Sequence, residues 1–204
     1  MLPSSITSIE KTERARIAWT MFVAIVLLWL APMIVGNIAI GHKKSSPLTR
    51  YYGEGGWVVL YGLSCFVWRL PERWFRPRRW EVRGRIYEIL GIRRFKQFMV
   101  GGDRHNRRVR QQLESYRTFA RGSTRRDMVR ETVATEKAHM LMFLFALWPT
   151  LFGALSGFWK YVLFMAACNS ATNIYPIMLQ RYTRSRITRI ALRESANSAA
   201  LSLD

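Results

Sequence analysis

Residues 130–186 contain two long apolar runs with ionisable residues at both outer ends. The stretch opens with RETVATEKAH (130–139), continues through about forty mostly apolar residues, and closes with MLQRYTRSR (178–186). A helical hairpin reversing at Ser156 and Gly157 would bring the two charged ends side by side. A polar cluster at a membrane boundary is by default a candidate functional site.

The first charged end carries a candidate general base. Glu136 and His139 are three residues apart and share a helical face, with Glu131 further back along it. Histidine, with an ordinary pKa of about 6.5, is suited to take a hydroxyl proton at neutral pH. Glu136 or Glu131 would orient the ring and stabilise the imidazolium.

The second charged end supplies candidate binding groups. Asn173, Gln180 and Arg184 are spaced by seven and four residues and therefore fall on one helical face. Asn173 or Gln180 could donate to a developing oxyanion, and Arg181, Arg184 and Arg186 could hold the phosphates of a donor. The structural alternative is that the glutamates pair with arginines across the hairpin and His139 is an ordinary boundary histidine.

Composition favours a membrane protein over a nucleic-acid-binding one. The 204 residues carry a net charge of +19, but half of them are hydrophobic and gather in blocks between the basic residues. Lys and Arg between apolar runs are typical of cytoplasmic loops that face anionic lipid. No zinc-finger, Walker or dinucleotide-binding motif is present, no metal site is predicted, and Cys65 and Cys168 lie inside apolar segments.

The apolar segments predict an all-α integral membrane protein of about four transmembrane helices, in a single domain over 1–204. The first helix covers 17–40, which is long enough to cross a hydrocarbon core. The segment 57–68 is short and forms either a second span or a re-entrant helix. Residues 69–137 hold about twenty Lys and Arg, so they are placed in the cytoplasm. A cytoplasmic N-terminus then requires four spans, and an external one requires three.

The segment 69–122 is predicted to lie on the bilayer surface. Its arginines are interleaved with Trp74, Phe75 and Trp80, a mixture suited to the headgroup layer. An amphipathic helix interrupted near Gly91 follows, although a solvated basic loop fits the same pattern. The helical hairpin then covers 124–155 and 158–194, with both helices extended into the cytoplasm.

Local signals define the first helix of the hairpin. Thr124 and Asp127 have the spacing of a capping box, and Pro149 predicts a kink within the helix. Basic residues continue the second helix to about residue 194.

Three blocks of the sequence resemble one protein family. They are WEVRGRIYEILGIRRFK (80–96), ETVATEKAH (131–139) and NIYPIMLQRYTRSR (173–186), with a similar RLPERWF string (69–75) before them. Together they resemble the glycosyl-diaponeurosporenoate acyltransferases of bacterial carotenoid synthesis, small membrane proteins that place a fatty acyl group on the sugar of a glycosylated carotenoid. The resemblance spans about two thirds of the chain.

The resemblance carries over a set of polar, aromatic and glycine positions. They are Trp80, Glu81, Gly84, Tyr87, Glu88, Arg93, Arg94, Lys96, Glu131, Thr132, Glu136, His139, Asn173, Gln180, Arg181, Tyr182, Arg184 and Arg186. The chain departs from the family pattern at a few places, which are Phe95, Met99, Val100, Tyr175 and Ser185.

The resemblance implies transfer of a fatty acyl group to a hydroxyl of a glycosylated carotenoid or similar lipid glycoside in the bacterial cytoplasmic membrane. No bound cofactor is expected. Acyl-CoA or a similar donor is the co-substrate, and a bound lipid or carotenoid is a further candidate ligand. Expected partners are anionic lipid headgroups and the glycoside, without nucleic acid. The alternative function is a non-catalytic structural subunit of a larger membrane complex.

The charge distribution predicts that both termini and the segment 69–137 lie in the cytoplasm. Single cysteines introduced at Ser4 and Ser123 should therefore resist a membrane-impermeant thiol reagent added to intact cells. Labelling at Ser4 alone would overturn the four-span topology in favour of three spans.

Overall fold

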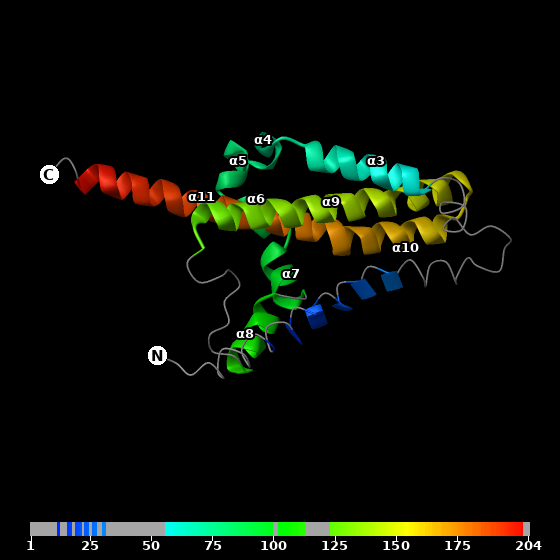
Figure 1. Cartoon of the computed structure of the whole chain (residues 1–204), viewed down its shortest axis with the longest axis horizontal. Coiled ribbons are helices and arrows are strands. Elements are labelled where there is room, and N and C mark those ends of the chain that lie inside the picture. The colour runs from blue at the N-terminus through cyan, green and yellow to red at the C-terminus, as the bar shows by residue number, and fades with distance from the viewer. Residues whose placement is uncertain are drawn as a thin grey trace.

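The computed structural model describes residues 56–99, 102–112 and 123–201, with scattered helical residues between 12 and 31. All regular structure in these ranges is helical, as the fold class predicted (Figure 1). Most of the first expected span, 17–40, lies outside the described residues. The elements are α3 (Gly56–Arg69), α4 (Glu72–Phe75), α5 (Arg79–Val82), α6 (Arg85–Ile89), α7 (Ile92–Phe98), α8 (Asp103–Gln112), α9 (Arg125–Leu155), α10 (Trp159–Asn169), the π-helical turn η1 (Ser170–Ile174) and α11 (Tyr175–Leu201).

The hairpin of α9 with α10, η1 and α11 forms the long axis of the molecule (Figure 1). Its first helix begins with the predicted capping box. The Thr124 amide donates to the Asp127 carboxylate at 2.9 Å, and the Asp127 amide donates to the Thr124 hydroxyl at 3.2 Å. These two bonds satisfy backbone donors that the first helical turn leaves unpaired.

A glycine closes the reversal between α9 and α10. Gly157 has a φ of 78°, a left-handed conformation that side chains with a Cβ rarely adopt. The Phe158 amide donates to the Gly153 carbonyl at 2.9 Å, and the Gly157 amide donates to the Ala154 carbonyl at 3.1 Å. This pair of bonds is a Schellman motif, which pairs the last carbonyls of α9 and turns the chain back.

A π-helical turn interrupts the returning helix at Ser170–Ile174. The Tyr175 amide bonds to the Ser170 carbonyl, five residues back. Pro176 follows directly, and because proline has no N–H, the Thr172 carbonyl loses its usual partner in the helix. π-turns of this kind occur frequently at functional sites.

Helix α3 lies along α9 and is tied to it by Lys137. The Lys137 ammonium donates to the carbonyls of Trp68 at 2.9 Å and Leu70 at 3.4 Å, at the C-terminal end of α3. It also lies 5.3 Å from the Phe75 ring centroid. A cation at this place satisfies terminal carbonyls and complements the negative end of the helix dipole.

The short helices α5, α6 and α7 pack on α11. Their shared core consists of Tyr87, Ile92, Leu179 and Tyr182. Gly84 adopts a φ of 71° between α5 and α6, and a Cβ there would lie 3.1 Å from the Tyr182 ring. Both the backbone conformation and the close approach therefore require glycine at this position.

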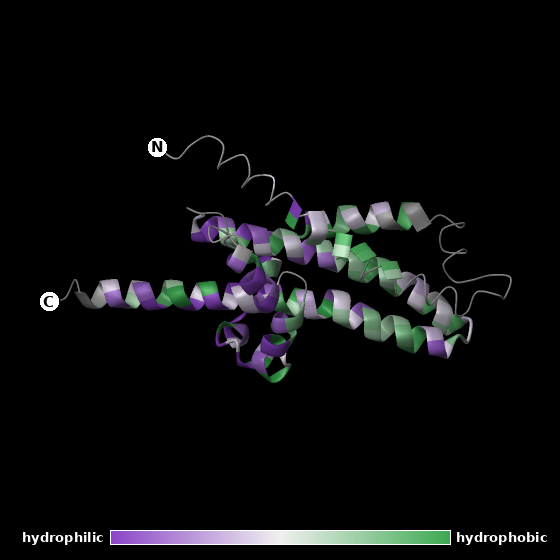
Figure 2. Cartoon of the chain, turned by 90° about the horizontal axis from the view of Figure 1, so that it is seen from below, coloured by the Kyte–Doolittle hydropathy of each residue, from purple (hydrophilic) through white to green (hydrophobic). Residues whose placement is uncertain are grey.

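The hairpin contains two helices that are long and apolar enough to cross a membrane, Arg125–Leu155 and Trp159–Ser198. Only 29% and 28% of their most apolar windows are buried, whereas a core helix of a soluble protein would be mostly buried. Figure 2 shows hydrophobic residues gathered toward the α9–α10 turn and hydrophilic ones toward the other end. The four-span arrangement is not established by the described residues, because α3 has only 14 residues and stays below span length.

Exposed apolar side chains are numerous on the helices that lie toward the α9–α10 turn. Large exposed hydrophobic residues on α3, α9 and α10 include Val58, Tyr61, Phe66, Trp68, Trp148, Leu151, Leu155, Trp159 and Leu163. An apolar surface of this extent is typical of contact with lipid or with another protein.

The close contact of α9 with α10 depends on a small residue at Gly153. A Cβ at this position would lie 2.8 Å from the Tyr161 ring, so Gly153→Val should push the helices apart and destabilise the protein by about 1–3 kcal/mol. The matched control is Gly62→Val, because nothing lies within 4 Å of a Cβ there. Thermal unfolding in detergent should show a lower midpoint for the Gly153 variant only, and equal midpoints would contradict this packing.

Candidate functional site

A buried ion-pair network joins the two charged ends of the hairpin to α5. Arg181 donates to Glu81 through Nε at 2.8 Å and to Glu136 through Nη1 at 3.1 Å. Arg184 donates to the other carboxylate oxygen of Glu136. Glu81, Glu136 and Arg184 are 2%, 1% and 1% exposed, so the charges are compensated inside the protein rather than by water.

Glu81 accepts further hydrogen bonds from its own neighbourhood. The Arg78 amide donates to it at 2.6 Å and the Tyr87 hydroxyl at 2.5 Å. Burial alone would raise the pKa of Glu81, but the bonds from Arg181, Arg78 and Tyr87 outweigh burial and lower the pKa. Burial together with the Glu81 carboxylate raises the pKa of Tyr87 to about 12. Glu81 is therefore ionised and Tyr87 is a hydrogen-bond donor at neutral pH.

His139 is oriented by two asparagines rather than by a carboxylate. Its Nδ1 lies 3.4 Å from the Asn173 side-chain oxygen, and the Asn173 amide nitrogen donates to the Asn169 oxygen at 2.7 Å. The Asn169 amide nitrogen donates in turn to the Phe143 carbonyl at 3.2 Å. This order of donors directs the Asn173 oxygen at the ring, and the Thr172 backbone also hydrogen-bonds to His139.

The expected site residues thus separate into three groups. Glu136, Arg181 and Arg184 converge in the ion-pair network, and His139 pairs with Asn173. The remaining three lie outside both contacts: Glu131 is exposed, Gln180 is half-buried, and Arg186 is exposed and lines a cavity. No described group of three or more side chains has the composition of a metal site.

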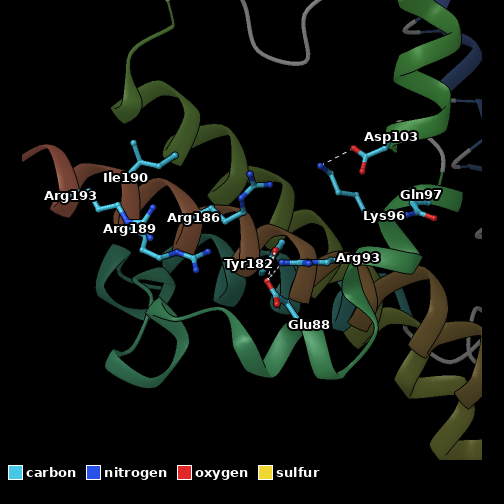
Figure 3. Close-up of a pocket in the computed structure, with 10 residues that line it drawn as sticks. All are labelled: Glu88, Arg93, Lys96, Gln97, Asp103, Tyr182, Arg186, Arg189, Ile190 and Arg193. Atoms are coloured by element: carbon cyan, nitrogen blue, oxygen red, sulfur yellow. Dashed lines mark hydrogen bonds and ion pairs between the residues drawn. The ribbon is translucent and has the colours of Figure 1, made fainter.

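A basic cavity of about 520 Å³ lies between α11 and the α6–α8 segment (Figure 3). Two of its cations are paired, Arg93 with Glu88 at 2.7 Å and Lys96 with Asp103 at 2.9 Å. Hydrogen bonds from the Tyr182 hydroxyl and Arg93 lower the pKa of Glu88, so the carboxylate is charged at neutral pH. The other cations of the lining come from one face of α11 and are Arg186, Arg189 and Arg193.

These three arginines carry the excess charge of the cavity. None of the ion pairs between described residues involves Arg186, Arg189 or Arg193. Arg189 is held by a 3.0 Å hydrogen bond to the Arg83 carbonyl. A cavity with this excess of guanidinium groups favours a ligand with several negative charges.

Two partners in the site were not assigned by sequence reasoning. Glu81 is paired with Arg181 across 100 residues, and no spacing rule connects positions so far apart. Asn169 supports Asn173 from the preceding turn of the helix. A signal for Asn169 does exist in the sequence, since an amide inside an apolar run must find an internal partner.

The fold and the site define a class of small all-helical protein, built on an apolar hairpin with a buried ion-pair network and a basic cavity toward its polar end. Residues 71–193 match the glycosyl-4,4'-diaponeurosporenoate acyltransferase family. This match covers more than half of the chain, and the chain belongs to that family. No curated protein and no solved structure matches the chain significantly.

Loss of the Glu81 charge should destabilise the protein strongly. Glu81→Gln leaves Arg181 with one carboxylate in a buried setting, and breaking such a pair costs about 3–5 kcal/mol. The control is Glu88→Gln, whose partner Arg93 is exposed, so the expected loss of stability is small. Chemical denaturation in detergent should separate the two variants, and similar midpoints would contradict a supporting role for Glu81.

The same network predicts a stability loss in acid. The folded-state pKa of Glu81 is below its unfolded value, so its stabilisation is present above about pH 4.3 and is lost as the pH falls through the folded pKa. The wild type should therefore lose more stability than Glu81→Gln between about pH 5 and pH 3.

Proposed function

We propose that the chain is an integral membrane enzyme that transfers a fatty acyl group to a hydroxyl of a glycosylated carotenoid or similar lipid glycoside. Membership of the family supports the reaction class. The observation that carries the proposal is the position of His139, oriented by Asn173 within the apolar half of a hairpin whose basic cavity lies further along α11. A lipid-soluble acceptor and a phosphate-bearing donor need these two environments close together.

In the proposed reaction His139 acts as the general base. Nε2 takes the proton of the acceptor hydroxyl while Nδ1–H is held by the Asn173 oxygen. The hydroxyl oxygen attacks the acyl carbonyl of the thioester, the C–S bond breaks, and the proton passes from His139 to the leaving sulfur. Asn173 offers a neutral dipole where a carboxylate was expected, so it orients the ring without a full countercharge.

Gln180 is the better candidate of the two amides for the developing oxyanion. The Asn173 nitrogen already donates to Asn169, whereas Gln180 is half-buried on α11, between Asn173 and the cavity. Glu136 has no part in the proton transfer in this scheme, because both of its oxygens accept from arginines.

The donor phosphates are assigned to the basic cavity. Arg181 and Arg184 are engaged by carboxylates, and Arg93 of the cavity lining is paired with Glu88. The arginines of the lining that remain for the phosphates are Arg186, Arg189 and Arg193. Asn173 of η1 and Tyr182 of α11 are nine residues apart, about 14 Å along the returning helix. An extended donor such as acyl-CoA would place its nucleotide in the cavity and its thioester toward His139.

The same arrangement supports a position in the membrane. The apolar half of the hairpin would lie in the bilayer, and the basic helices α4–α8 would face the anionic cytoplasmic leaflet of a bacterial membrane.

A non-catalytic subunit of a larger membrane complex is the second candidate function. The observation that favours it is the absence of a described carboxylate beside His139, since Glu136 is committed to the ion-pair network and Glu131 is exposed. The exposed apolar faces of α3, α9 and α10 would then contact protein as well as lipid.

The test of the enzyme is His139→Ala, assayed with the purified protein, an acyl-CoA donor and a glycosylated carotenoid. Loss of a general base should lower kcat by about 100- to 10,000-fold while the unfolding midpoint changes little. The control is His105→Ala, because His105 lies on α8 and does not line the basic cavity. Unchanged turnover in His139→Ala would remove the proposed mechanism, and wild-type inactivity with a copurifying partner at fixed stoichiometry would favour the subunit.

A further inference from the structure

A second cavity, of about 280 Å³, lies on another side of α11 from the basic cavity. Its apolar wall includes Phe75 and Pro77 from the α4 region, and Val129 and Val133 from α9. Arg184 and Thr188 of α11 also line it. The cavity is thus formed by three segments far apart in the sequence, at the end of the hairpin where charged residues replace apolar ones.

Arg184 lines this cavity and has two donors without a partner. Its Nη2 is paired with Glu136, but Nε and Nη1 are buried without a hydrogen-bond partner. The residue is only 1% exposed. A buried guanidinium with free N–H groups costs folding free energy unless a ligand accepts from it, and few such groups occur in folded proteins.

Further arginines line the cavity and add positive charge to that of Arg184. Arg76, Arg126 and Arg130 line the cavity with Arg184, opposed by the single carboxylate of Glu72. None of the ion pairs between described residues involves Arg76, Arg126 or Arg130. The net charge of the lining selects an anion, and the apolar wall selects an anion that carries hydrocarbon.

We propose that this cavity binds a phosphate ester, with Arg184 as its buried contact and Arg126 and Arg130 at its entrance. Phosphate oxygens accept charge-assisted hydrogen bonds from arginine, which would satisfy the two free donors. Two sources share this chemistry, the headgroup of an anionic phospholipid and the phosphates of a nucleotide-bearing acyl donor. The site is separate from the basic cavity and does not depend on acyl transfer.

Binding is measured with the full-length protein in a neutral detergent, through the shift in unfolding midpoint on adding each probe. The probes are dioctanoyl phosphatidylglycerol for the lipid source, coenzyme A for the donor source, and dioctanoylglycerol as an uncharged lipid without phosphate. A phosphate-bearing probe should stabilise the protein and dioctanoylglycerol should not. The source that occupies this cavity is the probe whose stabilisation falls in the two variants below, because those variants leave the lining of the basic cavity unchanged.

Two variants test the assigned contacts. Arg184→Lys retains a cation for Glu136 but removes the free guanidinium donors, and it should weaken the stabilising probe by roughly tenfold. The double variant Arg126→Gln, Arg130→Gln leaves the ion-pair network intact and should weaken the probe by a similar factor. If Arg184→Lys does not fold, the double variant alone tests the site.

The matched control is Arg107→Gln, Arg110→Gln, which removes the same charge from α8, outside this cavity. It should change the affinity by less than about twofold, since long-range charge effects are screened. Equal loss in the two double variants would reduce the effect to general surface charge and overturn the site. Failure of both phosphate probes to bind, or wild-type affinity in the Arg184 and rim variants, would overturn it as well. None of these measurements involves turnover, so the acyltransferase proposal can fail independently.

Discussion

The arrangement of the described helices depends on Glu136, whose two carboxylate oxygens accept from Arg181 and Arg184. One charge on α9 is thereby joined to two successive turns of α11, and Arg181 extends the connection to Glu81 on α5. Buried ion pairs contribute little net stability, because desolvation offsets most of the attraction. Their stronger effect here is geometric: any other register of α9 on α11 would leave a buried charge unpaired.

The polar groups are graded along the hairpin. Nearest the α9–α10 turn are neutral amides, Asn169 and Asn173, followed by His139, which can exist in a neutral form. The compensated ion pairs come next, and arginines such as Arg186, unpaired with any described carboxylate, lie beyond them. This order is the one that the cost of burial predicts, since an unpaired charge is least tolerable where hydrocarbon surrounds the helix.

Local features of the fold were predictable because short-range rules determine them. The Thr124 capping box and the Gly157 reversal both follow from residues within one turn of each other. Pairing of glutamates with arginines across the hairpin was anticipated as the structural alternative and holds for Glu136, but the individual partners were not predicted, although their spacing is regular. Phe143 pairs with Asn169, and His139 pairs with Asn173, so each step of four residues on α9 matches four on the returning helix. Antiparallel helices produce this ladder, but its register depends on side chains that meet only after folding.

The same reasoning explains why Glu136 does not support His139. A separation of three residues places Glu136 and His139 on one face of α9, as predicted. Both carboxylate oxygens of Glu136, however, accept from long arginine side chains of α11. The Glu81–Arg181 pair spans 100 residues and depends on the docking of α5, which no periodicity in the sequence encodes.

The three arginines of the seven-residue string QRYTRSR (180–186) therefore lie on different faces of α11. Arg181 and Arg184 point into the protein and are bound by glutamates, whereas Arg186 lies on the face that lines the basic cavity. A charge count along the sequence treats these three residues alike. Because of helical geometry, Arg181 and Arg184 stabilise the fold, whereas Arg186 is available to a ligand. Arg184 is also available to a ligand, because two of its nitrogens have no hydrogen-bond partner. The chemistry of the polar end follows from that division rather than from net charge.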